Sequence, residues 1–121
     1  MTTRRQRLGA LGEEVAARRL RELGYTVLER NYRCAAGEID IVAMDGNVLV
    51  LVEVRTRRGG RMGTPEESIS PRKKAKMIEV AQTYVAEREY AGDWRMDVVA
   101  VVLGAGGRVE RCEVIRNAVE G

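Results

Sequence analysis

The pattern of apolar and polar residues changes its period along the chain, and each change predicts a new element. Residues 5–23 place their apolar side chains on about half of a helical wheel, which predicts an amphipathic helix capped by Gly24. The half-polar run 25–32 predicts an edge strand, and the β-rich runs 39–44 and 48–54 predict two more strands. The first half of the chain is therefore predicted to form one helix followed by three strands.

The second half predicts one helix and two strands. Ser70-Pro71 supplies a serine N-cap and a proline at the first helical position, and an apolar stripe then extends to about residue 89. The runs 93–103 and 108–115 predict the last two strands. Helices at the start and between the third and fourth strands can cover both faces of a mixed sheet. The order α-β-β-β-α-β-β thus predicts an α/β fold, with a central mixed sheet of about five strands flanked by helices.

The predicted hairpin carries acidic residues within otherwise apolar strands. A two-residue turn at Asp45-Gly46 would place Asp40 opposite Leu51. Because side chains alternate along a strand, Asp40 and Glu53 would share one face as diagonal neighbours, roughly 7–8 Å apart. Two close carboxylates repel one another, and burial raises the cost of charging them. Mg²⁺ prefers one or two carboxylates plus water and phosphate oxygens, so this pair predicts a metal site.

An ion-pair cluster is the alternative. Glu38 and Arg55 fall on the same predicted face, and Arg55 could neutralise Glu53 and Glu38 there. Apolar residues at both parities indicate that both faces are covered, and buried charges are costly unless they are paired or metal-bound. This favours a functional site. Glu13, beside the apolar arc of the first helix, could supply a third carboxylate or pair with an arginine at the rim, and both options stay open.

Composition limits the chemistry that such a site can perform. With 121 residues we expect a single domain over residues 1–121. The chain contains no His, which excludes Ser-His and Cys-His catalysis and histidine metal sites. It has no apolar run that could span a membrane and no secretory signal, and its two cysteines, Cys34 and Cys112, favour reduced thiols. We therefore expect a cytoplasmic protein without a membrane partner, in which any hydrolysis uses carboxylates, Lys, Arg and a hard metal ion.

Positive charge is unevenly distributed. The net charge is only +3, but residues 55–76 contain eight Lys or Arg, and six Arg crowd residues 4–21. A charge run is usually a solvated face, yet clustering of this kind is also the footprint of a phosphate-backbone partner, and here it follows the acidic hairpin directly. The candidate nucleic-acid-binding residues are Arg57, Arg58, Arg61, Lys73 and Lys74.

Two sets of motifs carry a resemblance to known families. Asp40 followed by Glu53-Val54-Arg55 is similar to the core motif of the PD-(D/E)xK nuclease superfamily. More closely, GEE in the first helix, GEIDIVA, LVEVRTR, a lysine that opens the second helix (Lys73) and RMDVVAV resemble the YraN-type family of small bacterial proteins, from about residue 4 to residue 103. The resemblance implies a restriction-endonuclease-like fold, similar to archaeal Holliday junction resolvases.

The resemblance also implies a function, a Mg²⁺- or Mn²⁺-dependent endonuclease that acts on DNA, branched or structured DNA included. Asp40 and Glu53 would hold the metal, and Glu13 or Glu38 would complete its shell. Arg55 stands where the superfamily has lysine; it could stabilise charge on the phosphate or orient a water, but it cannot act as a general base. A junction resolvase needs two active sites, which leaves a homodimer open. The alternatives are a non-catalytic nucleic-acid-binding module and a protein-interaction domain with an internal ion-pair network.

Overall fold

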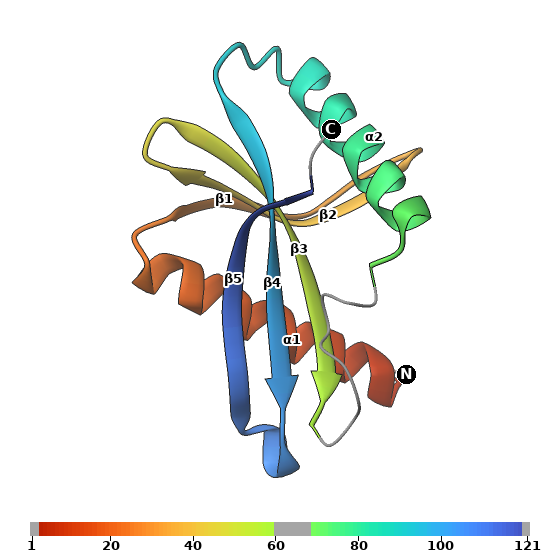
Figure 1. Cartoon of the computed structure of the whole chain (residues 1–121), viewed down its shortest axis with the longest axis vertical. Coiled ribbons are helices and arrows are strands. Elements are labelled where there is room, and N and C mark those ends of the chain that lie inside the picture. The colour runs from red at the N-terminus through yellow and green to blue at the C-terminus, as the bar shows by residue number, and fades with distance from the viewer. Residues whose placement is uncertain (1–2, 60–68, 120–121) are drawn as a thin grey trace.

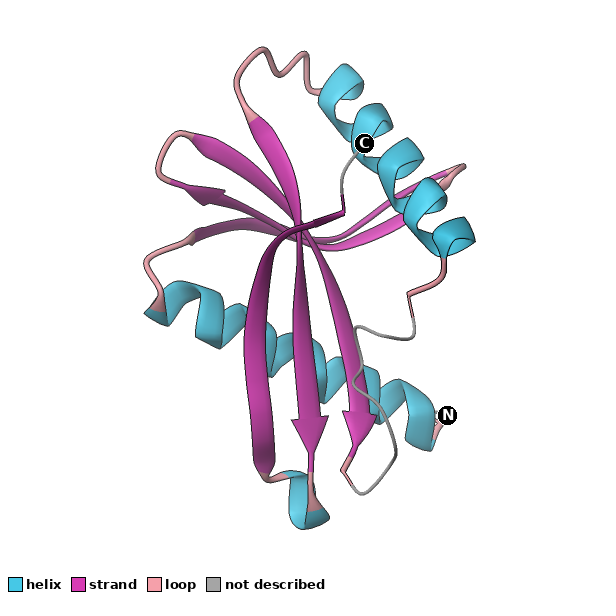
Figure 2. Cartoon of the chain, in the orientation of Figure 1, coloured by secondary structure: helices cyan, strands magenta, loops and turns pink. Residues whose placement is uncertain are grey.

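The structure is a computed structural model that describes residues 3–59 and 69–119. The predicted order of helices and strands is confirmed (Figures 1 and 2). The elements are α1 (Arg4–Glu22), β1 (Thr26–Cys34), β2 (Gly37–Asp45), β3 (Val48–Arg58), α2 (Pro71–Glu87), β4 (Trp94–Leu103), the 3₁₀ turn η2 (Ala105–Gly107) and β5 (Val109–Val119). Arg61, one of the candidate nucleic-acid-binding residues, lies outside the described residues.

One mixed sheet organises the fold. Its five strands lie in the order β1-β2-β3-β4-β5, with β3 and β4 parallel and all other neighbours antiparallel. Parallel strands need a crossover connection, which here contains α2. The two helices cover opposite faces of the sheet (Figure 1). The predicted α/β class with a central five-stranded sheet is therefore confirmed. No helix in the described ranges is long and apolar enough to cross a membrane.

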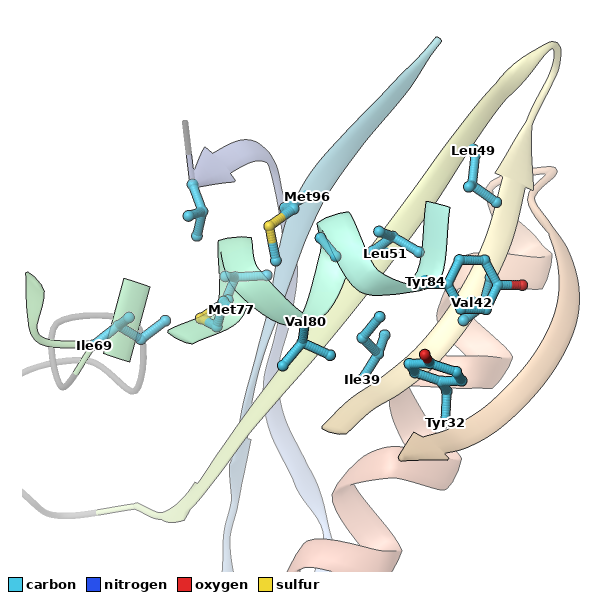
Figure 3. Close-up of a cluster of buried hydrophobic side chains, with 13 residues drawn as sticks. Tyr32, Ile39, Val42, Leu49, Leu51, Ile69, Met77, Val80, Tyr84 and Met96 are labelled. Atoms are coloured by element: carbon cyan, nitrogen blue, oxygen red, sulfur yellow. The ribbon is translucent and has the colours of Figure 1, made fainter. Parts of the chain in front are cut away.

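A hydrophobic core lies on each side of the sheet. Val50 and Val52 of β3 pack in the core beneath α1, whereas Leu49 and Leu51 pack in the core beneath α2. Figure 3 shows the α2 core, where Val80 lies over the sheet residues. This alternation explains why β3 has apolar residues at both parities, as a strand buried on both faces requires.

The hairpin turn lies one residue later than the sequence predicts. Asp45 pairs with Val48, so Gly46 and Asn47 form the turn, and the predicted turn at Asp45-Gly46 is wrong. Gly46 has a φ of 59°, which glycine adopts readily at the first central position of a type II′ turn. The register therefore shifts by two residues, and because this shift is even, the apolar side chains keep their predicted alternation between faces.

Gly12 lets α1 lie close against β3. A Cβ atom at Gly12 would lie only 1.9 Å from Oγ1 of Thr56, so only glycine fits without displacing the helix. The next turn of α1 presents Ala16 and Ala17, both fully buried, and their small side chains keep the helix near the sheet. This contact also fixes the height of Glu13, the next residue in α1, above the sheet.

Two glycines of α1 should respond to alanine in opposite directions. Gly12→Ala should lower the free energy of unfolding by roughly 1–3 kcal/mol, because the added methyl overpacks the contact with Thr56. Gly9→Ala should raise it by about 0.5–1 kcal/mol, since a Cβ at Gly9 meets nothing within 4 Å and alanine favours the helix. Urea unfolding of both variants measures the difference; equal losses would contradict the packing of α1 described above.

Candidate active site

The strands β2 and β3 separate at the point where the acidic residues lie. Their pairing runs from Asp45–Val48 to Ile41–Val52 and ends there. Beyond this point β3 stays paired with β4 on its other side, while β2 stays paired with β1 (Figure 1). We call the divergence of residues 37–40 of β2 from residues 53–58 of β3 the fork.

Asn31 of β1 marks the same point in the hairpin. It has a φ of 58°, the left-handed conformation that asparagine tolerates better than most residues. Residues two apart in a strand normally share a face, yet Arg30 faces α1 while Tyr32 packs in the α2 core. The paired strand changes in step, with Ile41 in the α1 core and Ile39 in the α2 core. The β1–β2 hairpin thus twists where it leaves β3, so side chains two residues apart face α1 on one side of this point and α2 on the other.

Asp40 lies at this change of face and directs its carboxylate at β3. Its Oδ2 accepts the backbone N–H of Val54 at 2.7 Å, so a side chain satisfies this amide just beyond the end of the β2–β3 ladder. Burial raises the pKa of Asp40 to about 7; the charge of Glu53 adds to this rise, and the hydrogen bond from Val54 opposes it. No Lys or Arg in the described part of the chain forms an ion pair with Asp40. Asp40 is therefore a partly buried acid whose negative charge lacks a basic partner there.

Glu53 is the second acid of the fork and is buried, with only 8% of its surface exposed. Asp40 and Glu53 each lie one residue beyond the last ladder pair, Ile41–Val52, so they are not the diagonal ladder neighbours that the sequence predicts. Two cations flank the same oxygen of Glu53, since Nζ of Lys73 lies 3.5 Å and a terminal nitrogen of Arg55 3.7 Å from its Oε1. Lys73 is held in the first turn of α2, where Oγ of Ser70 accepts its backbone N–H at 3.1 Å. A lysine predicted for nucleic-acid contact thus also lies against the buried carboxylate.

Glu13 occupies the rim position that the sequence left open. Its Oε1 accepts from Nε of Arg30 at 3.0 Å and from Nδ2 of Asn31 at 3.2 Å. Arg30 also binds Glu14, at 2.9 Å, so one arginine ties two consecutive glutamates of α1 to β1. The negative charge of Glu13 contributes to the raised pKa of Asp40, but less than Glu53 does.

Glu38 lies at the opposite margin of the fork. It is exposed and pairs with Arg33 across the β1–β2 hairpin at 3.2 Å, while its charge makes a further contribution to the raised pKa of Asp40. Within the described ranges, no three side chains of Asp, Glu or Cys gather into a group that could hold a metal ion. The central pair of carboxylates is thus Asp40 and Glu53, and the two other predicted ligands are bound by arginines.

Basic side chains continue along β3 from the acidic pair. Arg55 and Arg57 are partly buried, and Arg58 ends the strand exposed. Lys74 is exposed beside Lys73 in the first turn of α2. The fork therefore has a basic border on β3 and at the start of α2, as the sequence predicts for contact with a phosphate backbone.

A third acid of the sheet, Asp97, shows what a structural carboxylate looks like in this fold. It is fully buried, and it accepts hydrogen bonds from Nε of Arg95 at 2.9 Å, the hydroxyl of Tyr25 at 3.1 Å and the backbone N–H of Asn117 at 2.9 Å. These contacts join β4 to β5 and to Tyr25, the residue that precedes β1. Asp97 is fully satisfied, whereas Asp40 has a single backbone donor.

A family model described as "Uncharacterised protein family UPF0102" matches residues 12–101, which include Gly12, the hairpin, α2 and most of β4. The chain belongs to the UPF0102 family. The YraN-type membership inferred from the motifs is thereby confirmed.

UPF0102 relatives match over nearly their whole length. A UPF0102 protein of Moorella thermoacetica is 49% identical over 119 residues, covering 98% of this chain and 99% of the relative. One from Roseiflexus castenholzii is 48% identical over 122 residues, covering 99% and 98%. One from Pelotomaculum thermopropionicum is 45% identical over 119 residues, again covering 98% and 99%. The similarity therefore extends over nearly all of this chain and of these three relatives.

Replacing Asp40 should change how stability depends on pH. The folded chain holds the Asp40 proton up to about pH 7, whereas the unfolded chain releases it near its ordinary pKa of 3.8. Between these values the folded state binds more protons, so the free energy of unfolding falls as pH rises. Asparagine cannot ionise. Without metal, the wild type should therefore lose on the order of 1–3 kcal/mol more than Asp40→Asn between about pH 5 and pH 8.

Urea unfolding in EDTA measures this difference, and Asp93→Asn, at an exposed acid outside the fork, is the matched control. Parallel pH profiles for the wild type and Asp40→Asn would contradict the raised pKa. A large loss of stability for Asp40→Asn at pH 8 would show that Asp40 is instead the anion of a structural ion-pair network.

Proposed function

We propose that this UPF0102 protein is a metal-dependent nuclease with a restriction-endonuclease-like fold that hydrolyses phosphodiester bonds in DNA. The observation that supports this most directly is the acidic pair at the fork. Asp40 and Glu53 are neighbours, and no basic side chain of the described chain pairs with Asp40. Two close carboxylates of this kind are costly, and a divalent cation would remove that cost.

The donor set fits a hard cation. Asp40 and Glu53 offer only carboxylate oxygens, and a chain without His has no imidazole ligand. Mg²⁺ and Mn²⁺ suit oxygen ligands, and Mg²⁺ is commonly held by one or two carboxylates together with water and substrate phosphate oxygens. When bound, such an ion would lower the pKa of a water and neutralise charge that develops on the phosphate.

Arg55 and Lys73 divide the cationic roles beside the acidic pair. The planar guanidinium of Arg55 can bind and orient phosphate oxygens. Lys73 places a compact ammonium 3.5 Å from Glu53, which lets it donate to a phosphate oxygen or to the attacking water. In this proposal Lys73 takes the role of the motif lysine, whose position on β3 is occupied by Arg55.

DNA is the proposed substrate because of the basic border of the fork. Arg57, Arg58 and Lys74 extend the positive charge away from the acidic pair along β3 and α2. Contacts of this kind go to phosphates and position a strand without reading its bases. Branched or structured DNA is the finer expectation that the family resemblance adds.

A non-catalytic nucleic-acid-binding module is the second candidate. Two observations favour it: Arg55 occupies the position of the motif lysine, and no third acidic side chain of the described chain joins Asp40 and Glu53. The basic border would serve this function equally well. Dependence on metal separates the two candidates.

Mg²⁺ or Mn²⁺ should stabilise the wild type through the acidic pair. A ligand that binds only the folded state at 100 times its Kd adds about 2.7 kcal/mol to the free energy of unfolding. Thermal melts should show this rise in the wild type and in Asp93→Asn, but not in Asp40→Asn or Glu53→Gln. An equal metal-induced rise in all four proteins, or no rise in the wild type, would rule out a metal site at Asp40 and Glu53.

Lys73 and Lys74 should differ sharply in cleavage although they are adjacent. Lys73→Gln should slow metal-dependent cleavage by roughly 10²-fold or more, because it removes a donor beside the acidic pair, and should weaken DNA binding only slightly. Lys74→Gln, at an exposed position, should cleave nearly as the wild type does. The assay uses labelled linear, single-stranded and four-way DNA with Mg²⁺ or Mn²⁺. Binding of these DNAs without cleavage of any would favour the binding module instead.

A further inference from the structure

A pocket of about 350 Å³ lies between the start of α1 and the far end of β3. Arg4 and Arg7 of α1 and Arg58 of β3 line it, and no described lining residue is acidic. None of these three arginines forms an ion pair with a described residue. Glu110 packs against Gly104, one of the lining glycines, but does not itself line the space. We call this space the arginine pocket.

The first turns of α1 carry positive charge, which destabilises a helix at its N-terminus. Arg4, Arg5 and Arg7 occupy them, and the first turn contains no acidic residue. A helix N-terminus carries partial positive charge, so basic side chains there are unfavourable. The cap itself is complete, because Thr3 and Gln6 form a reciprocal capping box. A bound anion would offset this local excess of positive charge, as anions do at helix N-termini.

The other walls of the pocket are apolar or lack side chains. Leu11 is 41% exposed and lines the pocket together with Leu8. Gly106 and Gly107 form part of the wall with φ values of 69° and 78°, and a Cβ at Gly107 would lie 3.2 Å from a methyl group of Leu11. Such walls suit the sugar or base of a nucleotide, while the arginines suit its phosphate. Inorganic phosphate alone would not need the leucines.

The arginine pocket and the acidic pair lie on the same strand. Arg58 follows Glu53 by five residues on β3, or roughly 17 Å at about 3.3 Å per residue. Because this spacing is odd, the two side chains face opposite sides of the sheet. Beyond Val52, however, β3 has no pairing with β2, so a strand of DNA could follow that side of β3 from one face to the other.

We propose that the arginine pocket binds a backbone phosphate of the DNA strand that the fork acts on. At about 3.4 Å per nucleotide, this phosphate lies roughly five nucleotides from the acidic pair. The proposal depends on DNA as the partner in the proposed function, but it does not depend on cleavage. It assigns Arg4 and Arg7 a role in positioning the substrate.

Two double variants with the same loss of charge test the pocket. Arg4→Gln/Arg7→Gln empties it of two cations, whereas Arg5→Gln/Arg18→Gln removes two charges from the same helix at residues that do not line it. The Kd for labelled duplex and single-stranded DNA is measured in EDTA at several salt concentrations. We expect the pocket variant to bind about tenfold or more weakly and to lower the slope of log Kd against log salt by about two, and the control to change Kd by less than about twofold.

A stability measurement keeps folding separate from binding. The pocket variant removes basic side chains from a helix N-terminus, so its Tm should equal or exceed that of the wild type. A Tm lower than that of the control, together with weaker binding, would assign the arginines a structural role and overturn the proposal.

The other possible results of these measurements also test the pocket proposal. Equal losses of DNA affinity in both double variants would indicate a diffuse positive field and overturn the pocket, as would a wild type that binds no DNA. If only the pocket variant loses binding of a nucleoside monophosphate or inorganic phosphate while DNA binding is unchanged, the site takes small anions and the strand proposal falls. If the protein binds DNA without cleaving it, the proposed nuclease activity is wrong but the proposed phosphate site in the arginine pocket is not. The two double variants then test that site.

Discussion

The divergence of β2 from β3 after the Ile41–Val52 pair is the constraint on which the site depends. A sheet that loses a neighbour must satisfy the freed backbone amides in another way. Here the carboxylate of Asp40 accepts the N–H of Val54, which draws the acid partly out of solvent and places it beside Glu53. The same divergence leaves the second half of β3 without a β2 partner. A single hydrogen bond therefore links the shape of the sheet to the charge of its acidic pair.

The buried Asp97 and the partly buried Asp40 have opposite surroundings. Asp97 is surrounded by an arginine, a tyrosine hydroxyl and a backbone amide, and it ties the ends of the strands together. Asp40 has one backbone donor and a neighbouring negative charge. Desolvating a charge is repaid only when hydrogen bonds and opposite charges surround it. Asp97 meets that condition, whereas Asp40 would meet it only with a cation.

Both helices bring charge to the same half of the sheet, from opposite faces. α2 begins at a serine cap that holds Lys73 against Glu53, while Gly12 brings α1 so close to β3 that Glu13 reaches Arg30. The Asp97 network lies on β4 beside Val52, the last residue of β3 that pairs with β2. This fully hydrogen-bonded network next to the fork can support a local excess of charge there, where positioning of a substrate would need it.

The sequence by itself determined the order of elements, the two-faced burial of β3 and the family, because hydrophobic period, capping residues and motif order are local signals. It misplaced the hairpin turn by one residue, since Asp-Gly and Gly-Asn pairs both satisfy two-residue turns. Only the tertiary structure decided that Lys73 lies against Glu53, that Arg30 binds Glu13, and that Arg4, Arg7 and Arg58 share a pocket. Those contacts join residues far apart in the chain. They follow from the twist at Asn31 and from the crossover through α2, and the spacing of apolar residues along the chain predicts neither.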